Sequence, residues 1–411
     1  MKRPVAILLG GNKLHRGVVD KLHERGMKVI VVDWNPEPEL KGDHHLRVDT
    51  KDTGRVLEAL AQLGQMDVRV AYTSTDVAVP TAVAIHKRYG LCVPQGARYE
   101  APLSKAQMAT GWNEHKLLNR FSLLIPPGQQ QMLFAAARGK EVIVKPNVSS
   151  SSRGITIVTA GADETTLRTA LDRAQRYSFD GQAVVEEFFK GREFTVEMLG
   201  DSEGSVAVYA ISVKYHTVHA GPNRIANKLH YNSTVYPDET YDRIADYGRR
   251  CYRSLGLNCS FGHLEILMRE DGVLSPVEIG ARSGGFIAYP LVQLASGRDF
   301  FEDYLGVLGG ARVANQSYRT SISSMYFFYD FPPDRPCRNA THLCKHLPTG
   351  IESLYHDREA IDRGRTYRTI DNESERHGHE VLCGHRSTLT IEAVETAERR
   401  MLRTLFNGSE G

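Results

Sequence analysis

The architecture of this chain follows from one segment, Gly262-His-Leu-Glu-Ile-Leu-Met-Arg-Glu-Asp-Gly-Val-Leu-Ser-Pro-Val-Glu-Ile-Gly-Ala-Arg-Ser-Gly-Gly285. Residues 263–268 and 273–279 predict two strands, and the Asp-Gly pair between these apolar runs is a strong hairpin signal. Glu265 lies on the first strand and Glu278 on the second. Because opposed residues of an antiparallel pair share one face, we expect the two carboxylates side by side. Such a pair repels itself unless a cation lies between its members.

The residues that follow this carboxylate pair indicate that it belongs to a functional site and not to an ordinary exposed surface. Oxygen ligands on rigid strands suit Mg²⁺, which usually takes its other ligands from water and phosphate. Arg282, Ser283 and Gly284 follow the second strand after a two-residue Gly-Ala step. An arginine presents a fork that matches a carboxylate or a phosphate. The alternative, two solvated glutamates on an exposed face, leaves this tail unexplained.

The pattern resembles the ATP-grasp superfamily of carboxylate–amine ligases. The motif of that family is an acidic residue on one strand and Glu-x-Asn-x-Arg on the next, which matches Glu265 and then Glu278-Ile-Gly-Ala-Arg282. Gly280 stands where the family usually has an Asn that ligates a second metal, and this variant is similar to the L-amino-acid ligase (dipeptide synthetase) branch. The resemblance implies ATP and Mg²⁺ as cofactors, with Mn²⁺ as a substitute, and Glu265 and Glu278 as metal ligands. Whether a second metal binds stays open.

A second segment indicates a phosphate site. Residues 142–146 form an apolar run that holds Lys145, and a polar loop with four serines and a glycine follows over 149–154. A lysine in an apolar strand must direct its amine to an anion or to solvent. Backbone N–H groups and hydroxyls of such a loop can wrap phosphate oxygens. A hairpin with a disordered tip would explain the serines but not Lys145. The segment resembles the family's mobile lid, which implies ATP contacts from Lys145, Ser151, Ser152 and Gly154.

Two lysines compete for the role of the first phosphate lysine. The sequence Ser104-Lys105-Ala-Gln-Met108 resembles the start of a family helix, which we expect to continue to about residue 124. Lys105 is the candidate, and Lys116 is its rival because the segment is longer than usual. A solvated helix face is an alternative for either side chain.

Residues 184–196 predict a strand that breaks at Lys190-Gly191 and then resumes. In the family this is the hinge that holds the nucleoside. The resemblance implies that Glu187, Phe188 and Phe189 form an adenine slot. It also implies that Glu193 contacts the ribose and that Glu186 lies near the adenine amino group. The alternative is an ordinary hairpin with aromatic core residues. A polar segment over 216–230 is expected to border the cleft.

Strands and helices alternate through the first hundred residues, which predicts a parallel sheet of α/β type. The loop Gly10-Gly-Asn-Lys does not fit Gly-x-Gly-x-x-Gly, so no bound dinucleotide is expected there. We predict α/β and α+β architecture in four units: a Rossmann-like domain (1–104), an ATP-grasp small lobe with the Ser/Gly lid (105–185), a large lobe with the metal site (186–310) and a β-rich C-terminal lobe (311–411).

The charge, the cysteines and the apolar runs of the sequence exclude several classes of protein. The formal net charge of +2 excludes a globally basic nucleic-acid footprint. The six cysteines are dispersed, which is typical of free thiols in a reducing compartment. No apolar run reaches membrane-spanning length. We expect a cytoplasmic enzyme that binds small molecules, with no nucleic-acid or membrane partner, and a homodimer as an open alternative.

The resemblance implies an ATP-dependent ligase that activates a carboxylate, such as an amino acid, as an acyl phosphate and releases ADP and phosphate. Lys145 and Arg282 would be its catalytic residues, with Arg282, Ser283 and Gly284 binding substrate. The alternatives are a bicarbonate-activating carboxylase or purine-pathway ligase, and a nucleotide-binding protein without catalysis.

Overall fold

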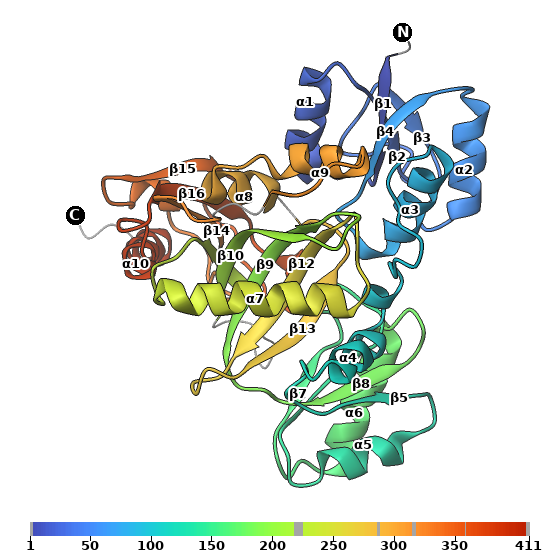
Figure 1. Ribbon diagram of the computed structural model, residues 1–411. Coiled ribbons are helices and arrows are strands. Elements are labelled where there is room, and N and C mark those ends of the chain that lie inside the picture. Colours follow the sequence, from blue (N-terminus) through green and yellow to red (C-terminus); the bar gives the residue numbers. More distant parts are fainter. Residues whose placement is uncertain (1–2, 218–224, 286–287, 315–317, 358, 408–411) are drawn as a thin grey trace.

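The computed structural model describes residues 3–217, 225–285, 288–314, 318–357 and 359–407 (Figure 1). Of the polar segment expected to border the cleft, residues 218–224 therefore lie outside the described part. The N-terminal domain and the small lobe lie at opposite ends of the molecule, and the large sheet lies between them. Within the described ranges, no helix is long and apolar enough to cross a membrane.

The N-terminal domain is a parallel sheet in the order β3-β2-β1-β4, with helices on both faces. Alternate residues of its central strand point to opposite cores: Ala6 and Leu8 pack with α1, whereas Ile7 and Leu9 pack with α2 and α3. This is the Rossmann-like arrangement that the alternating sequence predicted. The elements are β1 (Pro4–Leu9), α1 (Arg16–Glu24), β2 (Lys28–Val32), β3 (His44–Leu46), α2 (Thr53–Gln62), β4 (Asp67–Tyr72) and α3 (Val79–Arg88).

The small lobe is an antiparallel sheet in the order β5-β8-β6-β7, packed against two helices. The expected helix from Lys105 to about residue 124 was wrong. It ends at Glu114, and residues 122–125 form a strand because their apolar run pairs with residues 183–186. The elements are α4 (Lys105–Glu114), β5 (Ser122–Ile125), α5 (Gln130–Ala137), β6 (Val142–Pro146), β7 (Thr156–Val158), α6 (Glu164–Tyr177) and β8 (Ala183–Glu187).

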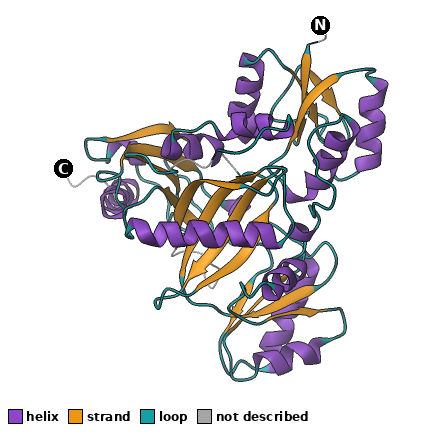
Figure 2. Cartoon of the chain, viewed as in Figure 1, coloured by secondary structure: helices purple, strands orange, loops and turns teal. Residues whose placement is uncertain are grey.

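The large sheet has the order β13-β12-β9-β10-β11-β14-β16-β15. The C-terminal strands lie beside those of the large lobe and extend the same sheet (Figure 2). The division of the chain at residues 104, 185 and 310 stays a prediction. The elements are β9 (Arg192–Gly200), β10 (Val206–His216), β11 (Ala226–Tyr231), α7 (Asp238–Ser254), β12 (Phe261–Met268), β13 (Leu274–Gly280), α8 (Ala288–Ser296), α9 (Phe300–Leu308), β14 (Ile322–Phe328), β15 (Ile351–His356), β16 (His379–His385) and α10 (Ile391–Asn407).

The two faces of this sheet differ in chemistry because side chains alternate along each strand. On β9, Phe194, Val196 and Met198 pack in the core beneath α7, which crosses the sheet in Figure 1. The residues between them, Thr195 and Glu197, point to the opposite face and are polar although buried. The hydrophobic contact with α7 therefore fixes which face of the sheet is left for polar side chains.

Candidate active site

A cleft of about 350 Å³ lies where the four predicted units meet. The N-terminal domain contributes the loop after β4, and the small lobe contributes the lid. The large sheet contributes its polar face, and the C-terminal part contributes Glu373 and Arg376. Of the residues predicted from sequence, the cleft is lined by Lys105, Lys145, Ser151, Ser152, Glu265, Glu278, Arg282 and Gly284.

The predicted carboxylate pair lies in this cleft. The register of β12 and β13 places Glu265 opposite Glu278, as the hairpin predicted. Each carboxylate has a lysine beside it: Lys214 Nζ lies 2.7 Å from Glu265, and Lys105 Nζ lies 3.1 Å from Glu278. Sequence reasoning missed Lys214, although a lysine in an apolar strand was the signal that identified Lys145.

The two carboxyls have different protonation tendencies. Burial, together with the charges of Glu193 and Glu278, raises the pKa of Glu265 to about 7 despite Lys214. Burial also disfavours the charge on Glu278, but Lys105, Lys145 and Arg282 outweigh it and lower the pKa of that carboxyl to about 2. A cation between them would favour both ionised forms.

These residues fit a magnesium ion that is shared with a nucleotide. In the described ranges no group of three or more His, Cys, Asp or Glu residues forms a closed metal site. Two facing carboxylates provide only part of an octahedral oxygen shell, and Mg²⁺ ordinarily completes such a shell with phosphate oxygens and water. The donor set thus matches the metal implied by the resemblance, with Glu265 and Glu278 as the residues that would hold it.

Gly280 and Asp76 form an unexpected junction between the sheet and the N-terminal domain. A Cβ atom at Gly280 would lie 2.6 Å from Asp76 Oδ1, closer than non-bonded atoms approach. An Asn at position 280 would therefore require the Asp76 carboxylate to move. Sequence reasoning missed Asp76, yet it follows the carboxyl end of the parallel strand β4, where ligands of α/β sheets usually bind.

Asp76 also holds the arginine that was predicted to bind substrate. Arg282 Nη2 donates to Asp76 Oδ2 at 2.8 Å, and both side chains are largely buried. The buried Nε of Arg282 has no hydrogen-bond partner among the described residues, so a donor remains for another anion. Ser283 is buried next to it and its hydroxyl lies 2.7 Å from that of Tyr72, which links the N-terminal domain to this tail.

The structure separates the two candidate phosphate lysines. Ser104 caps α4 by accepting a hydrogen bond from the backbone N–H of Gln107, so the helix begins at Lys105 and directs that side chain into the cleft. Lys105 is buried and donates to the carbonyl oxygen of Ser149 in the lid at 3.3 Å. Lys116 is exposed beyond the far end of the helix. This geometry favours Lys105 over Lys116.

Lys145 lies in a buried ion-pair cluster. Its Nζ is 2.8 Å from Glu186 Oε2, and Arg120 Nε donates to the same oxygen at 2.9 Å. Burial lowers the pKa of Lys145, and the nearby cations Arg120 and Lys105 lower it further, although Glu186 acts in the opposite direction. Burial disfavours the charge on Glu186, but Arg120 and Lys145 prevail and lower its pKa to about 2. Glu186 thus orients Lys145 in the structure.

The predicted nucleoside residues lie around the hinge, outside the lining of the main cleft. Glu187 is exposed, Phe188 is half-buried, and Phe189 is buried with the guanidinium of Arg269 over its ring. Glu193 pairs with His216 at 2.9 Å and with Lys214. Their assignment to adenine and ribose stays a prediction.

The lid has a strained backbone. Ser151 and Ser152 have φ values of 61° and 57°, a left-handed conformation that costs free energy in residues other than glycine. Gly154 also has a positive φ, and a Cβ there would lie 2.8 Å from Tyr177. In the lid itself, the carbonyl oxygen of Ser151 accepts a hydrogen bond from the backbone N–H of Glu373 at 3.3 Å. The lid region therefore contacts the C-terminal part of the chain.

Comparisons with known proteins agree with this geometry. Residues 139–289, which span the lid, the hinge and the carboxylate hairpin, match the family model of the ATP-grasp domain. The chain therefore contains an ATP-grasp domain.

Relatives in sequence and in structure cover more of the chain than this domain. A D-alanine–D-alanine ligase of Ralstonia nicotianae is 25% identical over 342 residues, which cover 77% of this chain and 92% of that protein. The uncharacterized protein y4rH of Sinorhizobium fredii is 24% identical over 284 residues, 67% of this chain, and the match spans little more than half of that protein, 56%. The crystal structure of an L-amino acid ligase from Bacillus licheniformis superposes with a TM-score of 0.75 over 98% of both chains at 17% identity, a likeness of fold.

Proposed function

We propose that this ATP-grasp protein is a ligase that uses ATP and Mg²⁺ to join a carboxylate to an amine, with an amino acid or a related acid as the carboxylate. The observation that carries the proposal is the convergence of Lys105, Lys145, Arg282 and the Glu265–Glu278 pair on one cleft. Cations and a metal-binding pair collected at one place suit the phosphate end of a nucleotide.

The chemistry follows from the poor reactivity of a carboxylate. In the first step, a substrate carboxylate oxygen attacks the γ-phosphorus of ATP, the bond from that phosphorus to the bridging oxygen breaks, and ADP leaves. In the second step, the amine attacks the carbonyl carbon of the acyl phosphate, inorganic phosphate leaves, and the amine loses a proton. Phosphoryl transfer needs positioning and neutralisation of charge more than covalent help from the enzyme.

The chain's own residues supply both requirements. Lys105 and Lys145 neutralise phosphate oxygens from the α4 and β6 sides of the cleft, and Glu186 keeps Lys145 in place. The fork of Arg282 holds the carboxylate of the acid. When bound to Glu265 and Glu278, Mg²⁺ would neutralise charge on the phosphates. The lid, which includes Ser151 and Ser152, would exclude water from the acyl phosphate.

The ion pair between Asp76 and Arg282 supports an amino acid as the acid. An α-amino acid carries an ammonium group beside its carboxylate, so it is complementary to a carboxylate and a guanidinium held 2.8 Å apart. In this arrangement Arg282 receives the substrate carboxylate and Asp76 the ammonium group. A bicarbonate substrate has no cationic group for Asp76.

The test is ADP release by the purified chain with ATP and Mg²⁺, measured with pairs of amino acids and, separately, with bicarbonate. The proposal requires ADP release that depends on added amino acids, together with a new amide detected by mass spectrometry. ADP release that depends on bicarbonate would favour a carboxylase. Nucleotide binding without turnover for any pair would favour a non-catalytic protein.

A further inference from the structure

Two cysteines that are distant in the sequence come together at the boundary of the N-terminal domain. The sulfur atoms of Cys92 and Cys259 are 2.8 Å apart, although the residues are 167 positions apart in the chain. This distance is shorter than an ordinary non-bonded contact, which is about 3.5–4.0 Å between carbon atoms. It is longer than the bond between the sulfur atoms of a disulfide, which is about 2.05 Å. Both thiols are free in the structure, so this pair lies close to bonding distance without being bonded.

The backbones that carry the two thiols are fixed relative to each other. The Arg98 N–H donates to the Gly256 carbonyl at 3.1 Å, and the Tyr99 hydroxyl donates to the Asn258 carbonyl at 2.8 Å. These bonds join the segment after α3 to the loop before β12. Cys259 itself has a φ of +43°, a conformation that persists only where the surroundings impose it. The sulfur contact is therefore part of an ordered junction.

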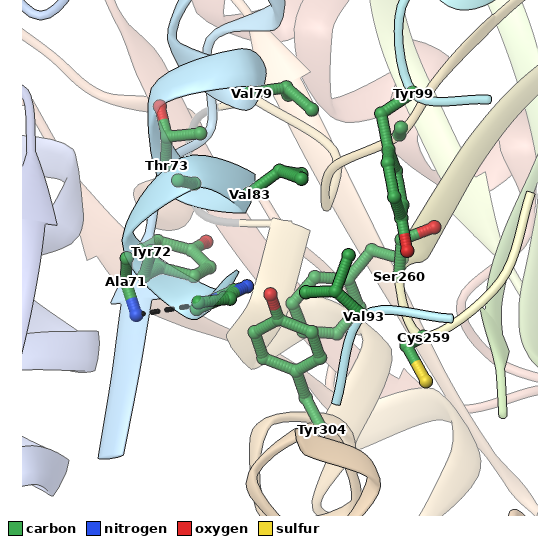
Figure 3. Close-up of a pocket in the computed structure, with 14 residues that line it drawn as sticks. Ala71, Tyr72, Thr73, Val79, Val83, Val93, Tyr99, Cys259, Ser260 and Tyr304 are labelled. Atoms are coloured by element: carbon green, nitrogen blue, oxygen red, sulfur yellow. Dashed lines mark hydrogen bonds between the residues drawn. The ribbon is translucent and has the colours of Figure 1, made fainter. Parts of the chain in front are cut away.

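The two thiols differ in access to solvent. Cys259 is buried, and Figure 3 shows it with Val93, Tyr99 and Tyr304 at the border of a cavity of about 20 Å³, roughly the size of one water molecule. Cys92 is only half-buried. Burial raises the pKa of the Cys259 thiol, and the neighbouring Cys92 thiol raises it further. Cys92 is accordingly the thiol that a dissolved reagent reaches first.

We infer that Cys92 and Cys259 are a redox modification site that forms a reversible disulfide with a low-molecular-weight disulfide as oxidant. The Cys92 thiolate attacks one sulfur of the oxidant, which releases one small thiol and leaves a mixed disulfide on Cys92. The Cys259 thiolate then attacks Cys92 Sγ, which releases the second small thiol. In total the protein loses two protons and two electrons, and the oxidant gains both as it becomes two small thiols.

This bond would connect two parts of the chain that border the active site. Cys92 follows the helix that ends the N-terminal domain, and its N–H donates to the Leu308 carbonyl of α9 at 2.9 Å. Cys259 precedes β12, the strand that carries Glu265. The disulfide would hold the N-terminal domain on the large sheet, and it would close a long loop in the unfolded chain, which stabilises the folded state.

The experiment incubates the folded full-length chain with oxidised glutathione and then alkylates the remaining thiols in denaturant. We expect a peptide that links Cys92 to Cys259, an intact mass lower by two hydrogens before alkylation, a higher Tm, and full reversal by dithiothreitol. Cys259→Ser should instead stop at a glutathione adduct on Cys92, while Cys92→Ser should form neither product. Cys344→Ser, which changes another half-buried thiol, is the matched control and should form the link normally.

The outcome that overturns the inference is read on the wild-type protein, so it does not depend on the folding of a variant. Equal alkylation of Cys92 and Cys259 before and after equilibration with the oxidant would overturn it. So would a link from either residue to a different cysteine at higher yield.

Discussion

Replacement of Asp76 by Asn tests whether the N-terminal domain contributes to recognition of the acid substrate. Asn preserves the size of the side chain but removes the negative charge that faces Arg282 at 2.8 Å. The proposed substrate ammonium group then loses a charge-assisted hydrogen bond. Hydrogen bonds to charged groups contribute about 1.5–3 kcal/mol. At about 1.4 kcal/mol for each factor of ten, kcat/KM for the amino acid should fall roughly 10- to 150-fold.

The assay is coupled ADP release at saturating ATP, with the amino acid varied and then with ATP varied. We expect the loss in kcat/KM for the amino acid and little change in KM for ATP, because Lys105 and Lys145, which we propose to bind phosphate, are untouched. A matched control is Asp67→Asn, which changes an exposed ion pair with Arg69 at the start of β4. The control should retain wild-type kinetics.

Two results would refute this reasoning. One is an Asp76→Asn enzyme with unchanged kcat/KM for the amino acid. The other is an equal loss for an acid of the same size that has no amino group, since Asp76 would then act only by positioning Arg282.

Three further predictions concern the metal pair, the arginine and the lid. Glu278→Gln should fold normally by circular dichroism but abolish turnover, because it removes a charged residue that would hold Mg²⁺; near-wild-type activity at saturating Mg²⁺ would contradict the assignment. Arg282→Lys should lower the rate although the charge is kept, because a point charge does not reproduce the two-pronged fork, and an undiminished rate would count against Arg282 as the carboxylate residue. Residues 149–154 should become more resistant to limited proteolysis when ATP and Mg²⁺ are added, because a polar loop gains partners from phosphate; equal cleavage with and without nucleotide would show that this loop is not the lid.

Features set by neighbouring residues could be predicted from the sequence. The hairpin of β12 and β13 depends on a local turn signal and on apolar alternation, so the opposition of Glu265 and Glu278 followed directly. The parallel sheet of the N-terminal domain could also be predicted from the sequence, because buried strands have unbroken apolar runs. The ATP-grasp resemblance rested on these same local patterns.

Features that depend on distant pairing could not be predicted in this way. The helix from Lys105 was extended too far because the partner of residues 122–125 lies about sixty residues later, in β8. The C-terminal strands join the large sheet through the pairing of β14 with β11, for which the sequence has no local signal. Asp76 reaches Arg282 only because two separate units meet, so no spacing rule could associate them.

Activation of the acid by ATP can be followed through one oxygen atom, from the acid to the released phosphate. The amino-acid substrate is labelled with ¹⁸O in its carboxylate, and the products of one reaction with ATP, Mg²⁺ and the amine are analysed by mass spectrometry. Activation as an acyl phosphate predicts ADP together with inorganic phosphate that carries one ¹⁸O. Unlabelled phosphate, or AMP that carries the label, would contradict the account.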